Sequence, residues 1–214
     1  MLFGRKTEAS FQILDPASKS SESAGQNLRV QNTSLRLTRS QSGLVVVDIQ
    51  ERLLPAIFEK DQLIQTSVRL IKGAAILGIP IFATEQYRKG LGPTSPEIAA
   101  AITGFTPLEK VTFSACGAEG FSDALKSREV TNVILCGIEA HVCVLQTCLD
   151  LLDHGLGVFV VADAISARNP ENSRLALQRM HDAGAVIAST EMVLFELLGR
   201  ARTEEFKQVQ ALVK

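Results

Sequence analysis

The chain has 214 residues, of which 46% are hydrophobic and 21% are charged, and its formal net charge is −1. This length and composition fit one soluble domain with a substantial core, or at most two small ones. The lack of a basic excess argues against a nucleic-acid or an anionic-membrane partner, and no apolar run is long enough to span a bilayer.

Residues 1–42 differ in composition from the rest of the chain. The stretch "SKSSESAGQNLRVQNTS" is rich in Ser, Asn and Gln and poor in apolar residues, which predicts a flexible or partly ordered N-terminal extension. The segment lacks the apolar core of a secretory signal, and we expect a cytoplasmic protein. Its basic residues and serines leave organelle import open as an alternative, although Glu8, Asp15 and Glu22 count against a transit peptide.

From residue 43 onward, short apolar runs alternate with helical patterns. Continuous apolar runs rich in β-branched residues predict strands that are buried on both faces of a sheet. Six such segments occur: "GLVVVDIQ" (43–50), "IPIFATEQ" (79–86), "LEKVTFSA" (108–115), "NVILCGI" (132–138), "GVFVVADAIS" (157–166) and "AVIAST" (185–190).

Between these strands, apolar residues recur with a spacing of three or four, which predicts helices. Ser95 is expected to cap one helix and Asn169 with Pro170 to open another, while Gly78 and Gly155 end two more. The predicted helices cover residues 63–78, 95–102, 120–130, 141–155 and 169–184, with helical segments to the C-terminus and a loop at "RKGLGPTSPE".

This alternation predicts an α/β domain over residues 43–214, with a parallel sheet covered by helices on both sides. In such folds, ligands bind beyond the carboxyl ends of the strands. Polar residues at or near these ends are therefore candidates for a site: Asp48, Gln86, Tyr87, Lys110, Glu139–Cys143, Asp163 and Ser166.

Cys143 stands where the fourth predicted strand gives way to a helix, in "LCGIEAHVCVLQT". A helix N-terminus lowers the pKa of a thiol because its free N–H groups and positive dipole end favour the thiolate, so the position predicts a nucleophile. The alternative is a small buried hydrophobe. The four cysteines, Cys116, Cys136, Cys143 and Cys148, form no C-x-x-C pair and no zinc-finger pattern, which predicts free thiols in a reducing compartment.

Asp48 and Lys110 complete a chemically sensible set with Cys143. A carboxylate can accept the thiol proton and later deliver it to a leaving group, and an ammonium group nearby stabilises both the thiolate and the carboxylate. Backbone N–H groups at a helix start can hold a developing oxyanion. The alternatives are a helix-capping carboxylate for Asp48 and a surface lysine for Lys110.

Four stretches carry a resemblance to a known family. In order along the chain they are "VVVDIQERLLPAI", "ATEQYRKGLGPTSPEI", "LEKVTFSA" and "CGIEAHVCVLQT". They resemble the isochorismatase-like cysteine hydrolase superfamily, and within it the branch of isochorismatase domain-containing proteins. The resemblance covers residues 43 to about 200. It implies a three-layer α/β/α fold with a six-stranded, mainly parallel sheet.

The resemblance also implies a Cys-Lys-Asp catalytic triad, which maps by motif onto Cys143, Lys110 and Asp48. A non-proline cis peptide that the family has shortly before its cysteine maps to Ile138–Glu139, and an oxyanion hole maps to the backbone N–H groups of Glu139 and Cys143. To substrate binding we assign Gln50, Gln86, Tyr87 and His141.

Two features separate the chain from parts of that family. Arg88 replaces the proline that is common in the loop after the second strand, which we expect to alter the pocket rim rather than the chemistry. The metal-binding Asp-x-His set of the nicotinamidases has no counterpart in "TEQYRKG", so we predict no metal and no cofactor. Because members that hydrolyse isochorismate generally lack the cysteine, an intact Cys143 resembles the amide-cleaving members.

The sequence thus predicts a hydrolase that cleaves a small amide or a related C–N bond of a small-molecule substrate. A catalytically silent or redox-sensing scaffold that retains the fold is the alternative. The near-neutral charge and the apolar stretches "EMVLFELLGRA" and "FKQVQALV" predict a homo-oligomer, a dimer or larger. These two stretches could instead complete the core of the domain.

Overall fold

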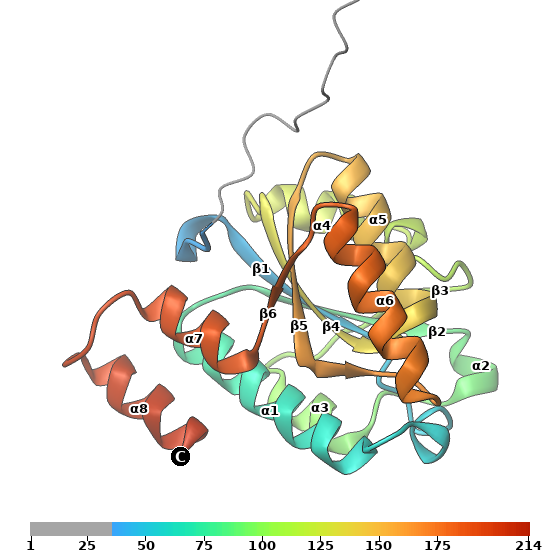
Figure 1. The fold of residues 1–214 in the computed structure, drawn as a ribbon, viewed down its shortest axis with the longest axis horizontal. Helices are drawn as coiled ribbons and strands as arrows, with labels where there is room; N and C mark the ends of the chain where they lie inside the picture. The colour runs from blue at the N-terminus through green and yellow to red at the C-terminus, as the bar shows by residue number, and fades with distance from the viewer. Residues whose placement is uncertain (1–35) are drawn as a thin grey trace, which may run out of the picture.

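The computed structural model describes residues 36–214, whose six strands form one sheet (Figure 1). The strand order is β3-β2-β1-β4-β5-β6, and every pairing is parallel. The strands are β1 (Ser42–Val47), β2 (Ile81–Gln86), β3 (Leu108–Lys110), β4 (Asn132–Ile138), β5 (Gly157–Ser166) and β6 (Val186–Ala188).

Helices cover both faces of this sheet, as Figure 1 shows. On one face lie α1 (Lys60–Ile76), α3 (Pro96–Ala101), α7 (Thr190–Leu198) and α8 (Glu204–Val213). On the other lie α4 (Phe121–Ser127), α5 (Leu145–Asp153) and α6 (Pro170–Asp182). The short α2 (Arg88–Leu91) follows β2. The predicted three-layer α/β/α fold is confirmed.

β1 lies in the interior of the sheet and is buried on both faces. Leu44 and Val46 belong to the core beneath α1 and α7. Val45 and Val47 belong to the core beneath α4, α5 and α6. Because successive strand residues point to opposite faces, a strand covered on both sides needs the continuous apolar run that this segment has.

The third predicted strand is shorter than its apolar pattern indicates. The sequence predicts a strand over residues 108–115, but β3 ends at Lys110, and a 3₁₀ turn follows at Ala115–Gly117. The carbonyl oxygens of Thr112 and Phe113 turn back and accept hydrogen bonds from the Lys110 ammonium group. An extended strand would carry these carbonyls away from that lysine.

The helix predicted over residues 141–155 begins with an irregular turn. Ala140–Val144 form a π-helical turn, and the regular helix α5 starts only at Leu145. Such turns are rare and occur frequently at functional sites. The irregularity includes Cys143, the residue that the sequence singled out as a nucleophile.

The start of the described chain packs against its C-terminal helices. Leu37 is buried, and its N–H donates to the Glu196 carboxylate at 3.1 Å. Arg39 donates to the Leu197 carbonyl at 2.9 Å and pairs with Glu205 at 3.0 Å. Of the N-terminal extension predicted over residues 1–42, residues 1–35 lie outside the described part of the chain.

The two C-terminal helices pack on α1. Val193, Leu194 and Val209 are buried, so much of the apolar surface noted in the sequence completes the core. Met192 is 58% exposed and Phe195 is 36% exposed, which leaves an apolar strip on α7. Within residues 36–214, no helix is long and apolar enough to cross a membrane.

Candidate active site

The strand order brings four strand ends together at the carboxyl edge of the sheet. β3, β2, β1 and β4 are neighbours in that order. Lys110, Gln86, Asp48 and Glu139 stand at or just beyond their ends. Asp48 and Lys110 are 62 positions apart in the chain, so the parallel topology makes them neighbours.

Asp48 directly follows β1 and is fully buried. Its backbone is left-handed, with a φ of 51°, a conformation that Asp adopts more readily than β-branched residues do. Its Oδ1 accepts a hydrogen bond from the Thr84 hydroxyl at 2.8 Å, and its Oδ2 accepts one from Lys110 Nζ at 2.6 Å. These donors supply the partners that a buried carboxylate requires.

The Lys110 ammonium group is buried, and acceptor oxygens surround it. Besides Asp48, Nζ lies 2.8 Å from Gln86 Oε1, 2.9 Å from the Phe113 carbonyl and 3.2 Å from the Thr112 carbonyl. Four acceptor oxygens surround a group that has three N–H donors. The alternative of a surface lysine is therefore wrong.

Cys143 is 7% exposed and lies in the π-helical turn that follows β4. The peptide bond between Ile138 and Glu139 is cis. Asp48 and the Glu139 backbone lie near enough to the thiol to influence its pKa. The Asp48 carboxylate is therefore a neighbour of both the thiol and the Lys110 ammonium group.

The pKa of this thiol differs from the expectation drawn from the sequence. Burial and then the negative charge of Asp48 raise the pKa of Cys143 to about 12, although Lys110 and the Glu139 backbone act in the opposite direction. The expected depression is wrong because burial and the carboxylate outweigh the lysine. Cys143 is thus a thiol beside a carboxylate.

Burial by itself does not distinguish Cys143 from the other cysteines. Burial also raises the pKa of Cys136 and of Cys148 to about 12. Cys116, which is only partly buried, has a raised pKa as well. What sets Cys143 apart is its partner, a carboxylate within hydrogen-bonding reach that can accept the thiol proton.

Gly137 permits the close packing of β4 against β1 beside the site. Its φ of +122° is one that L side chains rarely adopt, and a Cβ there would lie 2.0 Å from the Val47 carbonyl oxygen. Any other residue would push apart the two strands that carry Asp48 and the Cys143 turn. The glycine in "LCGIEA" is thus a requirement of the site's scaffold.

Gln50 makes hydrogen bonds within the fold, next to the site. It is fully buried, and its Nε2 donates to the Gln86 carbonyl at 3.0 Å and the Gly92 carbonyl at 2.6 Å. Its Oε1 accepts from the Gln86 N–H at 2.7 Å. This amide joins the segment after β1 to the loop after β2, and a role of Gln50 in substrate binding stays a prediction.

Gln86 and Tyr87 lie on the Lys110 side of the site. Gln86 accepts from Lys110 through Oε1, and its Nε2 donates to the Val111 carbonyl at 2.9 Å. The Tyr87 side chain is 54% exposed, and the backbone N–H of Tyr87 donates to the Lys110 carbonyl at 2.8 Å. Gln86 thus supports the lysine, whereas Tyr87 offers an exposed ring at the rim.

His141 and Glu139 are oriented by residues of the α6 region. His141 Nε2 lies 3.4 Å from Asn172 Nδ2, while its Nδ1 is buried and has no hydrogen-bond partner in the described structure. The Glu139 carboxylate accepts from the backbone N–H of Arg168 at 3.1 Å and from Arg168 Nε at 3.0 Å. The side chain of Glu139 therefore anchors the turn.

The sequence reading missed two residues in "ATEQY". Thr84 is the second donor to Asp48. Glu85 is fully buried; one of its carboxylate oxygens accepts from the N–H and the hydroxyl of Thr94 at 2.7 and 2.9 Å, and the other pairs with Arg88. An acid two residues after the apolar run "IFA" is the available signal, and Arg88 is its ionic partner.

Two further candidate residues, both in β5, have structural contacts. Asp163 accepts from the N–H and hydroxyl of Thr190, at 2.8 and 3.1 Å, at the first turn of α7. The hydroxyl of Ser166 donates to the Phe58 carbonyl at 2.8 Å. In residues 36–214, no group of three or more His, Cys, Asp or Glu side chains is placed to hold a metal ion.

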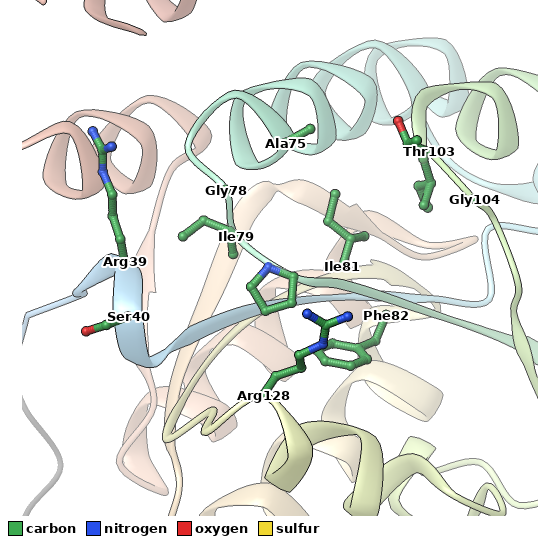
Figure 2. Close-up of a pocket in the computed structure, with 12 residues that line it drawn as sticks. Arg39, Ser40, Ala75, Gly78, Ile79, Ile81, Phe82, Thr103, Gly104 and Arg128 are labelled. Carbon is green, nitrogen blue, oxygen red and sulfur yellow. The ribbon is translucent and has the colours of Figure 1, made fainter.

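A hollow of about 650 Å³ lies at the opposite edge of the sheet (Figure 2). Its lining includes Ile79, Phe82, Arg39 and Arg128, which Figure 2 labels. Ile79 and Phe82 precede or begin β2, whereas Gln86 ends it. Arg39 precedes β1, and Arg128 precedes β4. At ~3.3 Å per residue, most of the strand length separates the hollow from Asp48 and Cys143.

Comparison with known proteins agrees with this architecture. The model of the isochorismatase domain matches residues 42–192. Isochorismatase domain-containing protein 2 from Homo sapiens is 41% identical over 180 residues, which are 84% of this chain and 86% of that protein.

Two solved structures extend the comparison. One described as MAR1 ribonuclease from Caenorhabditis elegans is 44% identical, has a TM-score of 0.79 and covers 83% of this chain and 92% of that one. The YcaC gene product of Escherichia coli, described as an octameric hydrolase of unknown specificity, is 26% identical, has a TM-score of 0.79 and covers 85% and 92%. The chain belongs to the isochorismatase family.

Proposed function

We propose that this chain is a cysteine hydrolase that cleaves a small amide or a related C–N bond, with Cys143 as the nucleophile. The observation that carries the proposal is one buried carboxylate, Asp48, which lies 2.6 Å from the Lys110 ammonium group and also acts on the Cys143 thiol. Family membership supports the hydrolase class.

In the first half of the reaction, Asp48 accepts the proton of the thiol as sulfur bonds to the substrate carbonyl carbon. The carbonyl π electrons move to oxygen, and the backbone N–H groups of Glu139 and Cys143 are the donors proposed to hold that oxyanion. Asp48 then gives its proton to the substrate nitrogen, the C–N bond breaks, and a thioester to Cys143 remains.

In the second half, water adds to the thioester carbon and Asp48 accepts the water proton. The C–S bond breaks, the acid product leaves, and the sulfur regains its proton from Asp48. Lys110 takes no part in bond making. Its four acceptors fix it in place, so it holds the carboxylate next to the thiol while the charge on that carboxylate changes.

The raised pKa of Cys143 fits this order of events. A resting thiol with a pKa near 12 carries little negative charge at neutral pH. Proton transfer to Asp48 then accompanies attack on the carbonyl. A paired base, rather than a free thiolate, activates the sulfur.

A screen of small amides and carbamoyl compounds tests the proposal. Wild type is compared with Cys143→Ala, and Cys148→Ala serves as a matched control because Cys148 is also buried and its pKa is also raised to about 12. We expect turnover in wild type and Cys148→Ala and its loss in Cys143→Ala. Equal turnover in all three would contradict the nucleophile, and no turnover in any would favour the silent scaffold.

Ribonuclease activity is a second candidate, favoured by the 44% identical C. elegans relative that bears that description. The net charge of −1 offers no basic excess for RNA, and Cys143 is only 7% exposed. A defined RNA incubated with wild type and with Cys143→Ala decides between them. Cleavage by wild type that Cys143→Ala abolishes would favour a ribonuclease reaction at this site.

We also propose that the chain forms a homo-oligomer. The octameric E. coli relative and the exposed Met192 and Phe195 of α7 support this assembly. Light scattering at micromolar concentration is expected to give a multiple of the chain mass. A monomer mass would refute the assembly.

A further inference from the structure

Thr147 lies between the segment that carries the nucleophile and the segment that surrounds the lysine. It is on the first turn of α5, four residues after Cys143, and is fully buried. Its hydroxyl donates to the Cys143 carbonyl at 2.7 Å and accepts from the Ala115 N–H at 2.9 Å. One hydroxyl group therefore uses its only proton on one segment and a lone pair on the other.

The Cys143 end of this bridge is a backbone group of the π-helical turn. In a regular helix, the carbonyl of Cys143 would accept from the backbone N–H of Thr147. The Thr147 hydroxyl donates to this same carbonyl, where the π-helical turn passes into α5. The carbonyl of the nucleophile's residue thus has a side-chain donor within the buried layer.

The Ala115 end belongs to the segment that holds Lys110. The carbonyls of Thr112 and Phe113 accept from Lys110 Nζ, and the Thr112 hydroxyl donates to the Ser114 carbonyl at 3.0 Å. Ala115 begins the 3₁₀ turn that follows directly. Movement of Ala115 would therefore displace the carbonyl oxygens that accept hydrogen bonds from the Lys110 ammonium group.

We propose that Thr147 is a positioning residue that fixes the Cys143 turn relative to the Lys110 segment, and so sets the placement of the thiol against Asp48. It touches neither substrate nor reacting atoms and acts through the backbone of Cys143 and Ala115. The proposal rests on the proposed hydrolase function. It predicts that the hydroxyl, rather than the bulk of the threonine, determines the activity.

Three variants separate the hydroxyl from the packing. Thr147→Val keeps the shape and removes both hydrogen bonds, whereas Thr147→Ser keeps the hydroxyl and removes a methyl group. Thr66→Val is the matched control, because Thr66 is a buried threonine on α1 that accepts from Gln62 at 3.1 Å, away from the site. If Thr147→Val does not fold, Thr147→Ala takes its place.

We expect Thr147→Val to lower turnover at least ~10-fold, because a misplacement of about 1 Å can cost ~10²-fold. Thr147→Ser should stay within about threefold of wild type, and Thr66→Val should leave turnover unchanged. Equal losses in Thr147→Val and Thr147→Ser, or a loss in Thr147→Val no greater than in Thr66→Val, would overturn the proposal.

The pH dependence of Cys143 alkylation by iodoacetamide gives a second readout that needs no substrate. Asp48 acts more strongly than Lys110 on the thiol and raises its pKa, so a looser contact should move the profile of Thr147→Val to lower pH. Thr147→Ser and Thr66→Val should keep the wild-type profile. An unshifted profile in Thr147→Val would overturn the positioning role even if no amide proves to be a substrate, which separates its failure from that of the proposed function.

Discussion

The amino edge and the carboxyl edge of the sheet differ in the kind of site that each one has. The amino edge has a hollow of about 650 Å³ with arginines and apolar side chains around it. The carboxyl edge instead has a buried, densely hydrogen-bonded set around Asp48, Lys110 and Cys143. The chemistry is better located by converging polar groups than by the volume of a hollow, because bond cleavage requires positioned proton donors and acceptors.

The largest expected effect tests this difference directly. Cys143→Ala and Asp48→Asn should each lower turnover by about 10³-fold or more, since nucleophile and base act as a unit. Arg128→Ala changes an exposed residue of the amino-edge hollow and should retain turnover within about twofold. Steady-state kinetics on a substrate found in the screen measure all three, and a large loss in Arg128→Ala would reverse the assignment of the edges.

Lys110 variants should combine a catalytic with a stability defect. Lys110→Met leaves the buried Asp48 carboxylate without its ionic partner, which costs about 3–5 kcal/mol, and turnover should fall ~10²-fold. Lys110→Arg keeps the charge, but its longer planar group cannot reproduce four acceptor contacts around one nitrogen, so most turnover should also be lost. Urea unfolding and kinetics give both values; a fully active, fully stable Lys110→Met would contradict the buried pair.

The pH dependence of Cys143 alkylation tests how the charges at the carboxyl edge affect the pKa of this thiol. Because the pKa of Cys143 is raised to about 12, its thiolate fraction is small at pH 7, and its alkylation rate should rise about tenfold per pH unit through pH 9. Asp48→Asn removes a negative charge that raises this pKa and should shift the profile to lower pH, whereas Lys110→Ala removes a charge that lowers it and should shift the profile to higher pH. Mass mapping of Cys143 after brief labelling follows each shift, and a plateau below pH 8 in wild type would count against the raised pKa.

Gln50→Leu is expected to affect stability much more than substrate binding. Gln50→Leu leaves the Gln86 N–H and two carbonyls without their present partner, and each buried unsatisfied group costs about 1–3 kcal/mol. The thermal midpoint should therefore fall clearly while KM changes by less than about threefold. A large rise in KM with an unchanged thermal midpoint would indicate that Gln50 contacts the substrate.

From the sequence, a residue of the site could be predicted only by its type and by its place at the end of a predicted strand. Asp48 and Cys143 follow apolar runs that a local pattern identifies, and both lie at the carboxyl edge. Glu85 has the same signal in "IFATE" but follows the polar Thr84, and its role became visible only through Arg88 and Thr94. The hydrogen bonds of the Gln50 amide could not be predicted, because the sequence does not show which way this amide points.

The sequence by itself determined the alternation of strands and helices, because the periodicity of apolar residues reflects the faces that each element buries. Only the tertiary structure decided that Lys110 meets Asp48 across 62 positions at 2.6 Å and that burial and this carboxylate raise the pKa of the Cys143 thiol. The physical reason is that desolvation and Coulomb interactions depend on distances in space. A helix start predicts a reactive cysteine, but its protonation depends on neighbours that another part of the chain supplies.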